Sequence, residues 1–418
     1  MTQRYDTYKD SGVQWLGEIP GHWGCVFINR LFNIKAGGDV KPELYADKKD
    51  ENHPFPVYTN TKSADDVYAY TSLATCPSNS ITVTGRGEVG HAIFRETPYD
   101  AIVRLLSLTP KSNIICKFYA YFIDTVIPFS SDSAAIGQLS AVQIKQKHVT
   151  LPPLSEQRSI VSFLDAKCGK IDEWVIKKQK EVEHLQELKQ RVIADAVTRG
   201  LNPHVKMKAT NIPWIKEIPE HWERNKVLRL FKQIGSGTTP SSGDASLYAD
   251  EGTPWLQSGD FNNNEINSTS KFLTDKALDN YSLKLYNSGG VVIAMYGASI
   301  GKVGLLNIAT TVNQACCVLS DSDHLLQKFS FYVFINEKDN LVKKSKGGTQ
   351  PNISQEIIKS HYIPVPPLSE QRSIVSYLDA KCSKIDKLIA NITKEIECIK
   401  EYKQRLISDV VTGQIKVC

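Results

Sequence analysis

One segment of this chain is present twice. Residues 151–172 read LPPLSEQRSIVSFLDAKCGKID and residues 365–386 read VPPLSEQRSIVSYLDAKCSKID, so that all but three positions are identical. The offset of 214 residues, 365 minus 151, continues through ELKQRVIADAVT at 187–198 and EYKQRLISDVVT at 401–412. A duplication of this kind marks a repeated structural unit. We therefore expect the chain to fold as two related halves.

A second pair of motifs opens the two halves. WLGEIPGHW occupies residues 15–23 and WIKEIPEHW occupies residues 214–222. Between each opening motif and the closing repeat, the two halves differ in sequence. Two nearly identical closing stretches beside two different variable stretches predict one mechanical role performed twice and two separate recognition roles.

The closing repeats are predicted to be long helices. Pro152 and Pro153 cannot lie inside a helix, and Ser155 is a good N-cap. Glu156 then places negative charge in the first turn, so we expect a helix to start at Ser155. Further along, apolar residues recur at alternating steps of three and four, with lysines at two interruptions. The apolar positions are Leu164, Cys168, Ile171, Val175, Val182, Leu185, Val192 and Ala196, and the interruptions are Lys178 and Lys189.

The second copy has a more regular heptad pattern, interrupted at Lys403. Its apolar positions are Leu378, Cys382, Ile385, Ile389, Ile392, Ile396, Ile399, Leu406 and Val410. Helices of roughly 45 residues would be about 65 Å long. Each could be an amphipathic helix that packs on its own domain. We favour two helices that pair with each other as an antiparallel coiled coil with pseudo-two-fold symmetry.

The variable stretches contain short apolar runs that are broken by Gly, Pro, Asn and Ser. SITVTGRGEVGHAIF in the first half and GGVVIAMYGASIGKVGLLNIA in the second predict strands joined by tight turns. SFYVFINEKDNLVKK predicts one of a few helices among them. The predicted fold class is α+β, with two domains of mixed sheet and helix that are each followed by a long helix.

Two glycine-rich motifs resemble nucleotide-binding loops but lack the required context. Residues 85–90 match GxGxxG, yet HAIF after Gly90 predicts a strand where a dinucleotide site needs a helix. The stretch from Gly297 to Lys302 is one residue too short for a phosphate loop. We expect the first loop to carry Arg86 outward. No methyltransferase tetrad, metalloprotease motif or serine hydrolase motif occurs, so no catalytic, cofactor-binding or metal-binding residue is predicted.

Composition limits the class of protein. The nine cysteines, an odd number with no CxxC pair, favour reduced thiols over a disulfide framework or a zinc site. The net charge of +5, from 50 basic and 45 acidic residues, does not by itself indicate a nucleic-acid partner. No apolar stretch approaches the roughly 18 residues of a membrane span, and MTQRYDTYKDSG at the amino terminus lacks the apolar core of a signal peptide. We expect a cytoplasmic protein.

Together these motifs resemble the specificity subunits of type I restriction-modification enzymes. The resemblance rests on YKDSGVQWLGEIPGHW, on the doubled PPLSEQRSIVS, and on YGASIGKVGLL, NQACCVL and GGTQPNIS in the second half. It extends from about residue 5 to the end of the sequence. It implies two target-recognition domains, 1–152 and 201–366, each followed by a spacer helix, 153–200 and 367–414.

The resemblance also implies partners and cofactors. Each domain would read one half of a bipartite site in double-stranded DNA, while the helices would fix the spacer and dock two modification subunits. Those methyltransferase subunits would bind S-adenosylmethionine, and restriction subunits, if present, would use ATP and Mg. This chain itself would be non-catalytic, would hold no cofactor and would have no membrane partner.

Candidate contact residues are predicted in both halves. For DNA they are Arg86 and Lys62 in the first half and Thr238, Thr239, Tyr296, Ser299, Lys302, Lys346, Gln350 and Asn352 in the second. For the partner interface they are Ser155, Glu156, Gln157, Arg158, Ser369, Glu370, Gln371 and Arg372. Arginine suits guanine, and asparagine or glutamine suits adenine. The first half reads SAAIGQLS at 133–140 where the second reads GGTQPNIS at 347–354, so the second half's contacts are not carried over to that loop.

Two other interpretations stay open. The chain could be a coiled-coil scaffold with two protein-binding domains, or a spare specificity chain that redirects a shared methyltransferase. A salt-sensitive affinity of the assembled complex for duplex DNA would separate the scaffold from a DNA-reading chain, because neutralised phosphates release counterions.

Overall fold

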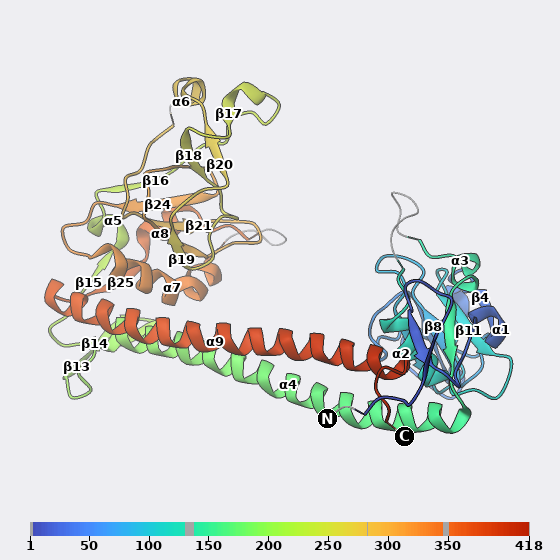
Figure 1. Ribbon diagram of the computed structural model, residues 1–418. Helices are drawn as coiled ribbons and strands as arrows, with labels where there is room; N and C mark the ends of the chain where they lie inside the picture. Colours follow the sequence, from blue (N-terminus) through green and yellow to red (C-terminus); the bar gives the residue numbers. More distant parts are fainter. Residues whose placement is uncertain (1–2, 130–137, 282, 346–350, 418) are drawn as a thin grey trace. The chain divides into compact units, whose positions relative to one another are not determined.

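The computed structural model describes residues 3–129, 138–281, 283–345 and 351–417. The chain divides into two compact units, each containing both helices and sheets (Figure 1). Unit 1 comprises residues 1–179 and 393–418, and unit 2 comprises residues 180–392. The predicted α+β class is confirmed for both.

Unit 1 is built around a four-stranded antiparallel sheet with the strand order β4-β11-β8-β9. Unit 1 also contains a second four-stranded sheet, with the order β10-β6-β7-β5, and two strand pairs, β1-β2 and β3-β12. The strands are β1 Tyr8–Asp10, β2 Glu18–Pro20, β3 Gly24–Phe27, β4 Phe32–Ala36, β5 Tyr45–Ala46, β6 Phe55–Tyr58, β7 Ala69–Thr71, β8 Ser80–Val83, β9 Ala92–Arg95, β10 Asp100–Ala101, β11 Leu106–Pro110 and β12 His148–Leu151. The short helices are α1 Ile28–Leu31, η1 Pro42–Leu44, α2 Cys116–Thr125 and α3 Ala141–Lys145.

Unit 2 repeats this plan. Its main sheet has the order β16-β24-β21-β22-β19, in which β19 is an added fifth strand parallel to β22. A second sheet has the order β17-β20-β18-β23, and β13-β14 and β15-β25 form pairs. The strands are β13 Met207–Ile212, β14 Ile215–Pro219, β15 Glu223–Lys226, β16 Gln233–Ser236, β17 Tyr248–Ala249, β18 Thr253–Leu256, β19 Asn264–Ile266, β20 Lys271–Leu273, β21 Val291–Ala294, β22 Val303–Leu306, β23 Thr311–Val312, β24 Cys316–Ser320 and β25 Tyr362–Val365. The shorter helices are α5 Val227–Leu230, η2 Ala245–Leu247, α6 Asp275–Tyr281, α7 Gln327–Lys343 and α8 Gln355–Ser360.

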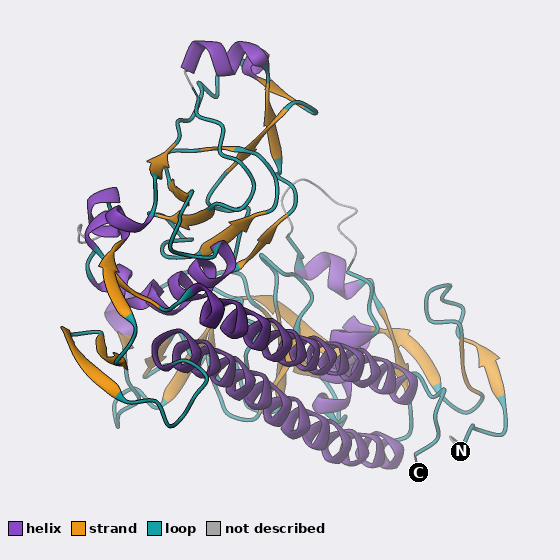
Figure 2. Cartoon of the chain, turned by 90° about the vertical axis from the view of Figure 1, so that its left-hand side faces the viewer, coloured by secondary structure: helices purple, strands orange, loops and turns teal. Residues whose placement is uncertain are grey.

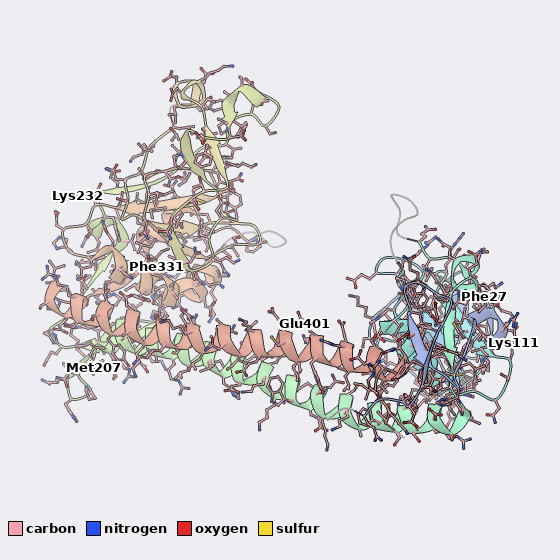
Figure 3. The ribbon with its side chains drawn as sticks, viewed as in Figure 1. Phe27, Lys111, Met207, Lys232, Phe331 and Glu401 are labelled. Carbon is pink, nitrogen blue, oxygen red and sulfur yellow. The ribbon has the colours of Figure 1, made fainter. Side chains whose placement is uncertain are left out.

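The central strands are buried on both faces. Every residue of β8 and of β21 is buried, as expected for strands inside a sheet that is covered on both sides. Helix α2 packs on the main sheet of unit 1, and α7 packs on that of unit 2. Phe331 of α7 is only 5% exposed within the unit 2 core (Figure 3).

The chain contains two long helices, α4 Leu154–Arg199 and α9 Leu368–Val411 (Figure 2). Each begins in one unit and ends in the other. In unit 1, Leu164 and Cys168 of α4 share the core with Val410 and Leu406 of α9. Asp172 of α4 pairs with Lys403 of α9, whereas Lys189, further along α4, pairs with Asp386, which lies earlier along α9. The two helices therefore run in opposite directions, and the predicted antiparallel pairing is confirmed.

Two of the three lysines that interrupt the heptads, Lys189 and Lys403, have acidic partners on the opposite helix. Lys403 Nζ lies 2.6 Å from Asp172 Oδ1 in unit 1, and Lys189 Nζ lies 2.7 Å from Asp386 Oδ1 in unit 2. Adding the offset of 214 to Asp172 and Lys189 gives Asp386 and Lys403, so the two ion pairs are pseudo-symmetric copies of one contact. Polar residues at single seam positions favour one register over its alternatives.

The predicted start of the first long helix was wrong by one residue. Helix α4 begins at Leu154, because the Gln157 N–H already donates to the Pro153 carbonyl at 3.0 Å. Ser155 therefore lies inside the first turn and is exposed. The side chain of Gln157 holds this end of the helix instead, by donating to the Pro152 carbonyl at 2.9 Å.

The GxGxxG segment is followed by a strand, as predicted from the sequence. Gly90 leads directly into β9 and not into a helix. Gly87 and Gly90 have φ values of +70° and +93°, which closes a tight loop between β8 and β9. Over the ranges that the structure describes, no helix is long and apolar enough to span a membrane.

Candidate nucleic-acid interface

The opening motif of each half is bonded to the start of the helix that closes that half. Glu156 Oε2 accepts from Trp23 Nε1 at 3.0 Å and from the Tyr5 hydroxyl at 2.8 Å, and Glu156 Oε1 lies 2.6 Å from His22 Nε2. Partial burial alone would raise the pKa of Glu156, but the hydrogen bonds from His22, Tyr5 and Trp23 hold that pKa below its usual value. The carboxylate therefore stays charged and fixes the helix to its domain.

Unit 2 uses the same arrangement. Glu370 Oε2 accepts from Trp222 Nε1 at 3.0 Å, and Glu370 Oε1 lies 2.5 Å from His221 Nε2. Gln371 is fully buried and donates to the Pro366 carbonyl at 2.8 Å, as Gln157 does in unit 1. Four of the eight residues predicted for a partner interface thus have internal bonds, and the exposed ones are Ser155, Arg158, Ser369 and Arg372.

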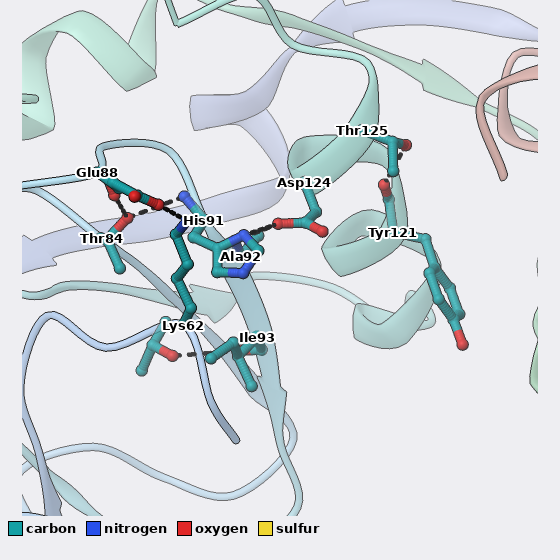
Figure 4. Close-up of polar contacts among 10 residues, drawn as sticks. Lys62, Thr84, Glu88, His91, Ala92, Ile93, Tyr121, Asp124 and Thr125 are labelled. Carbon is teal, nitrogen blue, oxygen red and sulfur yellow. Dashed lines mark hydrogen bonds and ion pairs between the residues drawn. The ribbon is translucent and has the colours of Figure 1, made fainter. Parts of the chain in front are cut away.

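The glycine loop of unit 1 is closed by its own polar groups (Figure 4). The Thr84 hydroxyl donates to the Glu88 carbonyl at 2.6 Å and accepts from the His91 N–H at 2.9 Å. His91 Nδ1 lies 2.5 Å from Asp124 Oδ1 on α2, which ties the loop to the helix. Lys62, one of the predicted DNA contacts, is exposed and forms an ion pair with Glu88.

Arg86 projects from this loop as predicted. Its side chain is exposed, while the backbone N–H groups of Gly85 and Arg86 both donate to Asn60 Oδ1, at 2.7 and 3.2 Å. Asn60 Nδ2 in turn donates to the Val103 carbonyl at 2.8 Å. Asn60 thus sets the position of Arg86, and no pattern in the sequence singled out this residue.

The corresponding loop of unit 2 has the same backbone bonds. Ala294 N–H donates to the Lys302 carbonyl at 2.9 Å and Gly301 N–H donates to the Ala294 carbonyl at 2.8 Å. In unit 1 the matching bonds run from Thr84 N–H to the His91 carbonyl and from Gly90 N–H to the Thr84 carbonyl, both at 2.9 Å. The two loops therefore share their backbone hydrogen bonds but differ in their side chains.

Three of the candidate residues of unit 2 come together at the edge of this loop. Tyr296 is paired with Asn352 through a β-bridge, and Thr239 hydrogen-bonds to Gln314. Burial raises the pKa of Tyr296, and a hydrogen bond from Gln314 opposes that rise. Gln314 was not predicted; it lies in NQACCVL, a motif that the resemblance had already singled out.

The other predicted DNA contacts of unit 2 differ in burial and in hydrogen bonding. Ser299 and Lys302 lie in the glycine loop and are half-buried, with the Lys302 N–H donating to the Ser299 carbonyl at 2.9 Å. Thr238 is exposed, and its carbonyl accepts from Trp255 Nε1 at 3.3 Å. Lys346 and Gln350 lie outside the described residues. The structure leaves the DNA-contact role of all these residues a prediction.

Comparison with known proteins identifies the family. The family described as type I restriction modification DNA specificity domain matches residues 20–184 and 219–398, which together are most of the chain. The MjaVIII type I restriction enzyme specificity subunit of Methanocaldococcus jannaschii is 25% identical over 96% of this chain and 94% of its own length. The EcoBI specificity subunit of Escherichia coli is 20% identical over 70% of this chain and 63% of its own length.

A solved structure shares the fold. A chain from a study titled "Structural basis underlying complex assembly and conformational transition of the type I R-M system" superposes with a TM-score of 0.72, at 16% identity. The superposition covers 94% of this chain and 98% of that one. With two matched copies of the family domain in one chain, this protein belongs to the family of type I restriction-modification specificity subunits.

Proposed function

We propose that this chain is the sequence-specific DNA-recognition subunit of a type I restriction-modification complex and that catalysis lies in its partner subunits. The proposal rests on a difference between the glycine loops of the two units, which share one backbone arrangement. The two glycine loops have matching backbone bonds, but Arg86 and His91 in unit 1 stand where unit 2 has Tyr296 and Lys302. A shared scaffold with different side chains suits two different half-sites, because base edges are read by a few side chains.

The long helices are proposed to set the spacer between the half-sites. Each helix is continuous and begins in one unit and ends in the other. Removing or adding one heptad in both helices should therefore change the gap that the complex accepts. A gap that stays the same would refute this role.

The same helices are proposed to dock two copies of one modification subunit. The buried residues of the repeat must be similar because both copies enter the same helix pairing. Exposed positions have no such constraint, yet Arg158, Ser162 and Lys170 recur as Arg372, Ser376 and Lys384, all exposed. Identical exposed surfaces favour one partner that binds twice.

The partner subunits are proposed to hold S-adenosylmethionine and, where a restriction subunit is present, ATP and Mg. The proposed place of action is the cytoplasm, where the DNA lies.

The decisive experiment is to co-express the chain with its modification subunit and to map methylated adenines in the host DNA at single-base resolution. A bipartite motif with a fixed gap that depends on this chain is the expected result. A stable complex with an active methyltransferase but no new methylated motif would overturn the proposal.

A further inference from the structure

In both units a β-bridge joins the glycine loop to the segment that precedes a short helix. Arg86 is bridged to Gln138 in unit 1, and Tyr296 is bridged to Asn352 in unit 2, both antiparallel. The neighbouring backbone bond is also repeated. The N–H of Leu139 donates to the Gly85 carbonyl at 2.9 Å, and the N–H of Ile353 donates to the Met295 carbonyl at 2.8 Å.

The local sequence around Gln138 does not indicate that Gln138 corresponds to Asn352. Gln138 lies in SAAIGQLS, which lacks the Gly-Gly and Gln-Pro-Asn residues of GGTQPNIS. Its number plus the repeat offset of 214 is 352, so geometry and register assign it to the same position as Asn352. Both positions carry a carboxamide side chain, although most of their neighbours differ.

The bridge determines where the side chains point. Residues directly opposite each other in an antiparallel pair project to the same face, with Cβ atoms about 4.5–5.5 Å apart. Leu139, the next residue, is 9% exposed and anchors the opposite face, as the fully buried Ile353 does in unit 2. Gln138 and Arg86 are therefore exposed side by side.

Neither polar group is used within the described part of unit 1. Among the residues that the structure describes, the Gln138 carboxamide has no hydrogen-bond partner and the Arg86 guanidinium has no ion pair. Their backbones, in contrast, are held firmly. Asn60 accepts from the Arg86 N–H, and Ser140 forms a capping box with Gln143 at the start of α3, two residues after Gln138. A fixed backbone that carries two unpaired polar side chains is preorganised for an external ligand.

We propose that Gln138 reads an adenine in the first half-site, on a base pair next to a guanine read by Arg86. A carboxamide offers one donor and one acceptor that match N7 and N6 of adenine, and a guanidinium matches O6 and N7 of guanine. Successive bases on one strand are about 3.4 Å apart, so two side chains at the bridged spacing reach the same or adjacent base pairs. The inference rests on the proposed reading of DNA by unit 1.

The test uses the assembled complex of this chain with its modification subunit. Gln138→Ala should relax the methylated motif at one adenine of the first half-site and leave the second half-site unchanged. The expected loss of preference at that base is about 5- to 150-fold, the range for one bidentate contact. Gln14→Ala, which removes another exposed glutamine of unit 1, is the matched control and should leave the motif unaltered.

A change of specificity makes the test stricter. Gln138→Arg should shift the preference at the same position from adenine toward guanine, a result that a merely structural role for Gln138 would not produce. If methylation by Gln138→Ala falls too low to map, the complex is titrated with duplexes that are substituted one base pair at a time. Loss of discrimination at one base pair beside the Arg86 position supports the inference.

Two results would overturn it. One is an unchanged motif and unchanged base-pair discrimination in Gln138→Ala; the other is equal relaxation of both half-sites. Either result, with a bipartite motif intact for the unaltered chain, refutes the role of Gln138 alone. Absence of any bipartite motif for the unaltered chain refutes the proposed function itself.

Discussion

The bonds at Glu156 give a quantitative prediction for the stability of unit 1. In Glu156→Gln the shape of the side chain is kept but the charge is lost. Hydrogen bonds to a charged group contribute about 1.5–3 kcal/mol, whereas bonds between neutral groups contribute about 0.5–1.5 kcal/mol. Since Tyr5 and Trp23 both donate to this carboxylate, we expect the free energy of unfolding of unit 1 to fall by about 2–3 kcal/mol at pH 7.

The effect should depend on pH in a defined direction. The pKa of Glu156 is lower in the folded chain than its usual value of 4.5. A group of this kind stabilises the fold fully above its unfolded-state pKa, and the stabilisation is lost as pH falls through the folded-state pKa. The difference between the unaltered chain and Glu156→Gln should therefore shrink on acidification below about pH 4.5.

Urea unfolding followed by pulsed hydrogen exchange measures the two units separately, because peptides from each unit report on their own opening. Glu370→Gln is the matched control in unit 2, where Trp222 donates to the carboxylate and no tyrosine of the described ranges does. Its effect should be smaller, about 1–1.5 kcal/mol for one bond, and confined to unit 2. Equal losses in the two variants, or a loss for Glu156→Gln that does not change with pH, would refute this reasoning.

Three further predictions follow from single contacts. Lys403→Glu should lower the free energy of unfolding by about 0.5–1 kcal/mol, and adding Asp172→Lys should restore most of that loss. A double-mutant cycle in urea measures both effects, and no recovery in the double variant would contradict the ion pair. Gly90→Ala should destabilise unit 1 by about 1–3 kcal/mol, because φ is +93° and the new Cβ meets the Phe129 ring; an unchanged urea midpoint would contradict this. Arg86→Ala should relax only the first half-site in a methylation map, and equal relaxation of both half-sites would show that Arg86 does not read that half.

The sequence predicted the helices better than the loops for a physical reason. A heptad pattern sustained over more than six turns specifies both the helix and the face that it buries. The sequence also indicated the register between the helices. Lys189 and Lys403 interrupt the apolar heptad positions at sites that are related by the repeat offset. Their partners, Asp386 and Asp172, become apparent only when the helices are placed antiparallel.

Residues of the interface were predicted only in part. Arg86 was identified because glycines on both sides predicted an exposed loop, but Asn60 and Gln138 were missed. Asn60 acts through a contact with residues 25 and 26 positions away, and Gln138 through a bridge to a residue 52 positions away, 138 minus 86. Such pairings carry no local signal.

By itself, the sequence determined that this chain is a duplicated α+β protein with two pairing helices, because repetition and heptad spacing are properties of the linear order. It also determined the family, through motifs that lie in the structural frame. The tertiary structure alone decided that Glu156 bonds to Trp23, that Gln157 accepts from the Ile115 N–H, and that Gln138 lies beside Arg86. These contacts join segments far apart in the chain, and only the folding of the sheet and the docking of the helix bring them within hydrogen-bond distance.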